Sequence, residues 1–172
     1  TTAFARRPAL WLKLMAEKKF GRKVDAGFMN HGGIRSYIPQ GNISVGKIFE
    51  LMPFDNLVVL QEVKGTILQQ FLDKTASDGG WPVSAGVSLR IKDKKAFNVT
   101  IGGKQLDENA TYVIANTDYI ANGGGNCEML RKIPKIDKGY LVRDALIEYI
   151  IEFTQQGKPV DARIENRVAN VN

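Results

Sequence analysis

The sequence contains one cysteine, one histidine and no long apolar run. A lone Cys127 excludes a disulfide scaffold, and a membrane helix would need about 20 consecutive apolar residues. Zinc and most transition-metal sites need several converging ligands, so a dinuclear site built on histidines is not expected. A cysteine–histidine catalytic dyad would have to join Cys127 to His31, and no neighbour in the sequence indicates the orienting partner that such a dyad needs.

Net positive charge is absent outside one short stretch. The 172 residues carry 24 Lys and Arg against 18 Asp and Glu, a net charge of +6. Residues 1–23 hold seven of these cations and one acid, so residues 24–172 have no net charge. Nucleic-acid binding would favour basic residues interleaved with aromatic ones, a pattern that this stretch does not show. The charge indicates one basic end, and we expect no nucleic-acid partner.

Most of this basic end is predicted to be a helix over residues 8–21. Pro8 suits a first helical position, and Gly21 suits a C-terminal cap. An apolar stripe at helical spacing is formed by Leu10, Trp11, Leu14 and Met15. Two interpretations of the cations stay open. They form a solvated, dipole-matched helix end, or Arg6 or Arg7 turns inward to bind a phosphate.

The remaining chain alternates strand and helix patterns. We expect strands at residues 24–29, 57–63, 87–91, 97–101, 112–116 and 162–168. We expect helices at residues 44–51, 66–75 and 140–156, and a flexible glycine-rich loop at 122–126. No linker or repeat interrupts this order. It predicts a mixed α/β (α+β) fold in one domain over residues 1–172, with mixed sheets flanked by helices.

One strand leads directly into a motif that suits ligand binding. The strand at 24–29 is followed by Asn30-His31-Gly32-Gly33-Ile34-Arg35. Ligands in α/β sheets bind at strand ends, and glycines there let the backbone approach a ligand closely. Arg35 adds a planar, permanently charged group suited to phosphate or ribose oxygens.

Four segments in order resemble a known family. They are FMNHGGIR (28–35), LMPFDNLVVLQEVKGTIL (51–68), VSAG (83–86) and NTDYIANGGGN (116–126). From about residue 24 to its end, the chain is similar to the C-terminal domain of the 5′-nucleotidase family, which includes UDP-sugar hydrolases and 2′,3′-cyclic-nucleotide phosphodiesterases. The resemblance covers less of the basic end.

This resemblance implies a division of labour between two domains. In the family, an N-terminal metallophosphoesterase domain holds two divalent metal ions, and the C-terminal domain recognises the nucleotide and carries it to them. For this chain it implies nucleotide or nucleoside recognition, no cofactor of its own, and no hydrolysis in isolation. The expected partners are a nucleoside monophosphate and a metallophosphoesterase domain on the same or a neighbouring polypeptide. The expected location is periplasmic, cell-surface or secreted.

The resemblance also assigns roles to individual residues. Phe54 and Tyr119 match two aromatics that clamp the base by stacking, a contact that tolerates any base. Asn30 and Arg35 match residues that contact the nucleotide. The other matching positions are Gly32, Gly33, Asn56, Gly86, Gly123, Gly124 and Asn126. Alternatively, the two aromatics are core residues, Arg35 makes a surface ion pair and Asn30 caps the turn.

The chain departs from the family pattern at two places. Gly125 stands where the family usually has an aspartate that accepts hydrogen bonds from the ribose, and Asn126 beside it is a candidate substitute. Lys13-Leu14 stands where an Asp-Ala pair is expected, and Pro8 interrupts the pattern near the family's phosphate-binding arginine. These departures keep a second interpretation open, that of a degenerate, non-enzymatic ligand-binding module.

Overall fold

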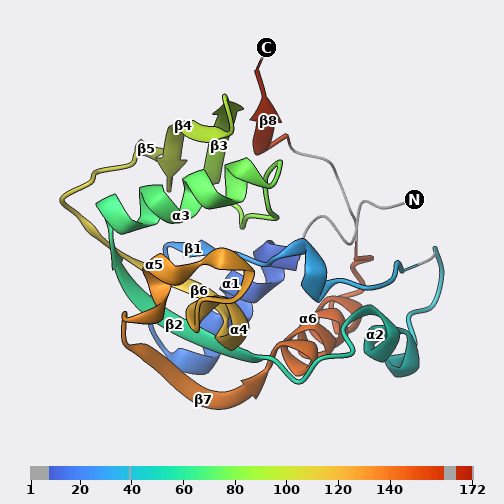
Figure 1. The fold of residues 1–172 in the computed structure, drawn as a ribbon. Helices are drawn as coiled ribbons and strands as arrows, with labels where there is room; N and C mark the ends of the chain where they lie inside the picture. Colours follow the sequence, from blue (N-terminus) through green and yellow to red (C-terminus); the bar gives the residue numbers. More distant parts are fainter. Residues whose placement is uncertain (1–7, 39, 161–165, 172) are drawn as a thin grey trace.

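Residues 8–38, 40–160 and 166–171 are described by the structure, which is a computed structural model (Figure 1). Within these ranges the chain forms two four-stranded sheets and helices of very different length. No helix of the described ranges is long and apolar enough to cross a membrane. Arg6 and Arg7, for which a phosphate-binding role stayed open, lie outside the described residues.

The first sheet has the strand order β1-β6-β2-β7. Its members are β1 (Ala26–Gly27), β6 (Thr111–Thr117), β2 (Leu57–Lys64) and β7 (Lys135–Leu141). Strand β1 runs parallel to β6, whereas β2 is antiparallel to both β6 and β7. The carboxyl ends of β1 and β6 and the amino end of β2 therefore lie at one edge of this sheet.

The second sheet has the strand order β5-β4-β3-β8. Its members are β5 (Lys104–Gln105), β4 (Lys95–Ile101), β3 (Val87–Lys92) and β8 (Val168–Asn170). Strands β3 and β4 form a hairpin, and β8 lies parallel to β3. Asp93 and Lys94 both have positive φ angles, as a tight two-residue turn between twisted strands requires.

Helix α3 (Gly65–Ser77) lies between the two sheets (Figure 1). Its Leu68, Phe71 and Leu72 are fully buried against residues of both sheets. The opposite face of the first sheet is covered by α1 (Pro8–Phe20) and α6 (Val142–Gln155). Because the first sheet is buried on both faces, β2 is a nearly continuous apolar run instead of an alternating one.

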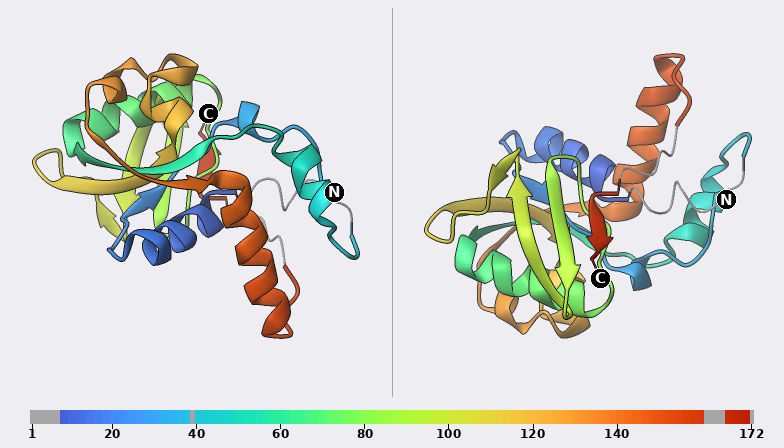
Figure 2. Two further views of the ribbon diagram at one scale, coloured as in Figure 1. Left: turned by 90° about the horizontal axis from the view of Figure 1, so that it is seen from below. Right: turned by 90° about the horizontal axis from the view of Figure 1, so that it is seen from above.

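Short helices lie in the segments that connect the strands of the first sheet. They are η2 (His31–Gly33), α2 (Val45–Leu51), α4 (Asp118–Ala121), η3 (Gly124–Asn126) and α5 (Glu128–Arg131). Ser44 caps α2 by accepting from the Lys47 amide, and Thr117 caps α4 by accepting from the Ile120 amide. In both views of Figure 2, α2 and α6 extend from the sheets on the same side of the molecule.

The mixed α/β fold predicted from the sequence is confirmed, as are the helix starting at Pro8 and the cap at Ser44. Four predictions of local structure were wrong. The strand predicted over residues 24–29 is confined to Ala26–Gly27. The long helix starts at Val142, because residues 140 and 141 end a strand, β7, that was not predicted. The last strand is Val168–Asn170, shifted toward the C-terminus, and residues 161–165 lie outside the described residues. The glycine-rich stretch expected as a flexible loop contains η3.

Gly65 provides a test of the packing between α3 and the loop before β6. A Cβ at this position would lie 2.0 Å from the Asp107 carbonyl oxygen, which is backbone and cannot move aside alone. We expect Gly65→Ala to lower the free energy of unfolding by about 3 kcal/mol, the upper range for overpacking. Gly46→Ala in α2 is the control, because its Cβ would meet no atom closer than 4.0 Å. Urea denaturation measures both, and an equal effect of the two substitutions would contradict the prediction.

Candidate functional site

The candidate site is the edge of the first sheet where β1 and β6 end and β2 begins. Gly27 pairs with Ala115 in the parallel ladder, and Val58 pairs with Thr117 in the antiparallel ladder. The segments that continue from these positions carry Asn30, Phe54 and Tyr119. Three stretches that are distant in the sequence thus meet at one place.

The two aromatics of the predicted clamp are surface residues. Phe54 is 42% exposed and Tyr119 is 47% exposed, although most other large apolar side chains near the sheet are buried. Their exposure contradicts the alternative that both rings belong to the core. Exposed rings at a strand edge are free to stack against a ligand.

One carboxylate ties the two aromatic segments together. Asp118 Oδ1 accepts from the Leu57 amide at 3.0 Å and from the Tyr119 amide at 3.0 Å. Leu57 follows the segment that carries Phe54, so a single side chain fixes the backbone on both sides. This role of Asp118 was not predicted, because an aspartate at the start of a helix is common for local reasons.

The Asn30 turn leaves a buried acceptor without a partner. Asn30 Oδ1 is buried and accepts no hydrogen bond within the described part of the chain. Its amide lies over the two glycines, since a Cβ on Gly32 or Gly33 would stand 3.3 or 3.2 Å from the amide atoms. The side chain does not cap η2, contrary to the alternative expectation. An unpaired buried acceptor typically costs about 1–3 kcal/mol, which a ligand donor would recover.

Arg35 lies beside the first aromatic. Its guanidinium carbon is 5.2 Å from the centre of the Phe54 ring, and its amide donates to the Leu51 carbonyl. Among the described residues no ion pair joins Arg35 to an acid, which argues against the alternative of a surface ion pair. The exposed cation is therefore free to meet an anionic group next to the ring.

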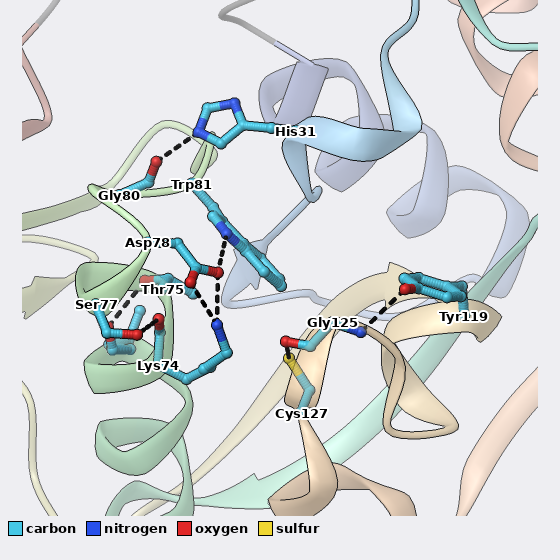
Figure 3. Close-up of polar contacts among 11 residues, drawn as sticks. His31, Lys74, Thr75, Ser77, Asp78, Gly80, Trp81, Tyr119, Gly125 and Cys127 are labelled. Atoms are coloured by element: carbon cyan, nitrogen blue, oxygen red, sulfur yellow. Dashed lines mark hydrogen bonds and ion pairs between the residues drawn. The ribbon is translucent and has the colours of Figure 1, made fainter.

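The glycine-rich stretch folds under Tyr119. The Gly125 amide donates to the Tyr119 hydroxyl at 3.1 Å (Figure 3). A Cβ on Gly124 would lie 2.5 Å from the Tyr119 carbonyl oxygen and 2.6 Å from its ring. Gly123 has a φ of 92°, a conformation open to glycine. Asn126 is exposed with a φ of 62°, so its side chain remains available to a ligand.

Trp81 and His31 belong to this region, although the sequence did not assign them to it. A Cβ on Gly125 would stand 3.1 Å from Trp81 Cη2, so the indole crowds the position where a side chain would begin. Trp81 is held by a 3.0 Å hydrogen bond from Nε1 to Asp78 (Figure 3). His31 donates from Nε2 to the Gly80 carbonyl at 2.7 Å and so joins the Asn30 turn to the Trp81 segment.

Gly86 and Asn56 are placed differently from the other predicted residues. The Ser84 amide donates to the Gly27 carbonyl, and Phe28 bridges to Val83, so this segment runs antiparallel to β1 and moves away from Asn30. Gly86 lies beyond it, where its carbonyl accepts from Gly102. The structure does not bring Gly86 to the aromatics. Asn56 is half-buried next to Phe54, and its carbonyl accepts from the Val142 amide at 2.8 Å.

Neither metal nor thiol chemistry is supported by the described residues. They contain no group of three or more His, Cys, Asp or Glu side chains that could hold a metal ion. The Cys127 thiol lies 3.8 Å from the Gly125 carbonyl and is buried, whereas His31 is engaged by Gly80. Burial raises the pKa of Cys127 to about 11, which keeps the thiol protonated and weakly nucleophilic.

A family model described as "5′-nucleotidase, C-terminal domain" matches residues 9–132. The chain belongs to this family. The matched range contains every residue that the sequence assigned to the site. The matched range ends before β7 and α6, so the family model does not cover these two elements.

Curated relatives and solved structures agree with this membership. Protein UshA of Yersinia enterocolitica is 30% identical over 154 residues, covering 87% of this chain and 27% of the relative. A 5′-nucleotidase of Vibrio cholerae is 30% identical over 144 residues, covering 81% and 25%. The 5′-nucleotidase precursor of Thermus thermophilus superimposes with a TM-score of 0.82 at 25% identity, covering 98% and 35%. The chain thus spans about a quarter of the length of these curated relatives.

Cys127 of this 5′-nucleotidase C-terminal domain gives a pH-dependent prediction. Its pKa is raised from 9.0 to about 11 on folding, so the folded state disfavours the thiolate. The contribution of the protonated thiol to the free energy of unfolding is fully present below pH 9 and is lost as the pH rises toward 11. We expect Cys127 to react with a disulfide reagent at pH 8 only as fast as the protein opens, and Cys127→Ser to flatten the loss of stability above pH 9.

A second variant checks the thiol measurement. Ser77→Cys, at an exposed position at the end of α3, supplies a thiol in the same protein that should react at the rate of a free peptide thiol. Equal labelling rates for Cys127 and the new cysteine in native buffer would contradict the assignment.

Proposed function

We propose that this chain is the nucleotide- or nucleoside-recognition domain of a 5′-nucleotidase-like phosphohydrolase. The observation that carries the proposal is the pair of exposed rings, Phe54 and Tyr119, fixed to one sheet edge by the shared Asp118 carboxylate. In this proposal the base stacks between the two rings. Family membership supports this assignment, because the named relatives include 5′-nucleotidases.

Charge and hydrogen-bonding groups around the rings suit the remainder of a nucleotide. Arg35, beside Phe54, supplies a cation for the phosphate or ribose oxygens. Asn30 supplies an amide whose oxygen has no partner among the described residues, and Asn56 and Asn126 add further amides near the rings. Gly32 and Gly33 leave room for the Asn30 amide, and Gly123 and Gly124 leave room for Glu128 and the Tyr119 ring.

The proposal assigns the hydrolytic step to another domain. The phosphate is presented to a metallophosphoesterase domain with two divalent metal ions, on the same or a neighbouring polypeptide, and the isolated chain binds without hydrolysis. The chain's share of about a quarter of its relatives' length is consistent with such a division. A periplasmic, cell-surface or secreted location is part of the same proposal.

The clamp is tested by titrating the chain with AMP, adenosine and UMP in a calorimeter. We expect all three to bind, because stacking tolerates any base, and Phe54→Ala or Tyr119→Ala to weaken binding by about tenfold to a hundredfold. Phe153→Ala is the control, since this half-buried ring packs on Tyr149 near the far end of α6. No detectable binding, or a Phe54→Ala variant equal to the parent, would contradict the proposal.

A second candidate function is a degenerate, non-enzymatic nucleotide- or ligand-binding module. Gly125 favours it, since an aspartate there would need a φ of 65°, which non-glycine residues adopt uncommonly, and its Cβ would stand 3.1 Å from the Trp81 ring. The two functions differ in whether the gene encodes a metallophosphoesterase domain on the same or a neighbouring polypeptide. The absence of such a domain from both would favour the module.

The Gly125 position also predicts how the ribose is recognised. Because no carboxylate side chain projects from it, we expect AMP and 2′-deoxy-AMP to bind with affinities within about threefold of each other, a difference below about 1 kcal/mol. The same titrations with Asn126→Ala report any contribution of the neighbouring amide. A preference for AMP above tenfold that Asn126→Ala removes would show that Asn126 replaces the carboxylate and would refute the prediction.

A further inference from the structure

One buried cation contacts the segment that carries Phe54. Arg143, the second residue of α6, is 7% exposed. Its Nη1 donates to the carbonyl oxygens of Met52 and Phe54 at 3.3 and 3.4 Å, and its Nη2 donates to Asp55 Oδ1 at 2.7 Å. One guanidinium therefore binds three oxygens within four consecutive residues.

We propose that Arg143 is a positioning residue that sets the place of Phe54 in the candidate site. The inference rests on the proposed function, because it concerns the same aromatic clamp. Among the described residues of the predicted site, Arg143 hydrogen-bonds only to Phe54, through the backbone carbonyl. It acts through the backbone of residues 52–55 and determines where the Phe54 ring stands relative to Tyr119.

Phe54 needs such a support because core packing does not hold it. Its ring is 42% exposed and lies against the guanidinium of Arg35, which is a surface side chain. The next two residues of the chain are held by other hydrogen bonds. The Asn56 carbonyl accepts from the Val142 amide, and the Leu57 amide donates to Asp118. Arg143 is the residue that extends this anchoring to the carbonyl of Phe54.

The position of Arg143 is unfavourable for a cation on other grounds. It lies in the first turn of α6, where the helix dipole favours negative charge. Its Nε is buried without a hydrogen-bond partner among the described residues, and burying a cation requires compensating contacts. The compensation comes from the 52–55 segment and from the Phe49 ring, 4.1 Å from the guanidinium carbon. A planar fork can reach these groups together, and a lysine ammonium cannot.

The test compares Arg143→Lys in two backgrounds by NMR titration with AMP, which reaches millimolar dissociation constants. With Phe54 present, we expect about tenfold weaker binding. In a Phe54→Ala background, we expect less than a twofold further loss, because the residue acts through that ring. Arg22→Lys is the matched control, since Arg22 pairs with Glu62 at the opposite end of the sheet. An equal loss in both backgrounds, or no loss in either, would overturn the proposal.

Two further tests cover the cases in which Arg143→Lys fails to fold or AMP fails to bind. The first is a second variant, and the second is a measurement made without ligand. Asp55→Asn removes the charged partner at a side chain that is 78% exposed, so it should reduce AMP affinity severalfold without unfolding the protein. Amide hydrogen exchange in Arg143→Lys, without ligand, should rise at least tenfold at Leu57 and Val142 while Ile114 in β6 stays unchanged. If the parent chain fails to bind AMP, the proposed function fails, and unchanged exchange at these amides would separately overturn the role of Arg143.

Discussion

The antiparallel pairing of β2 with β6 is the constraint on which the site depends. The register runs from Val58 opposite Thr117 to Lys64 opposite Thr111, so β2 begins where β6 ends. A slip by one residue would reverse the faces of a strand that is buried on both sides. Because the register is fixed by burial, the residues before β2 and after β6 must lie close together. The hydrogen bond from the Leu57 amide to Asp118 then joins two segments that the sheet already holds side by side.

The energetic cost of polar burial is concentrated at the same edge. The buried side-chain atoms without partners in the described part of the chain are Asn30 Oδ1, Asn116 Oδ1 and Arg143 Nε. Asn30 follows β1, Asn116 lies at the end of β6, and Arg143 contacts the segment before β2. A fold selected for stability alone would avoid such atoms, which typically cost about 1–3 kcal/mol each. Of the three, Asn30 Oδ1 belongs to the candidate site, and it is the atom that a ligand donor would satisfy.

The sequence predicted what local chemistry controls, and it failed where tertiary contacts decide. Periodicity and caps were sufficient for α1, for α2 behind Ser44 and for the β3–β4 hairpin. Strand β7 was missed because it is an edge strand whose first five residues are all exposed, the charged Lys135, Asp137 and Lys138 among them. Arg143 was missed because a charged residue in a helix pattern is typical of a solvent-facing position. Its burial follows from contacts with a segment almost 90 residues away, which no local pattern records.

Cations in and directly after α1 form ion pairs with acids of the same domain. Lys13, Lys18, Arg22 and Lys23 pair with Glu17, Glu152, Glu62 and Asp25. Two of these acids, Glu62 and Asp25, lie beside Val113 near the start of β6, at the end of the sheet opposite Tyr119. Exposed ion pairs add little stability, yet they neutralise the local field that would attract a polyanion. The described cations of residues 13–23 are therefore largely paired with acids, and Arg22 and Lys23 lie at the end of the sheet opposite the candidate site.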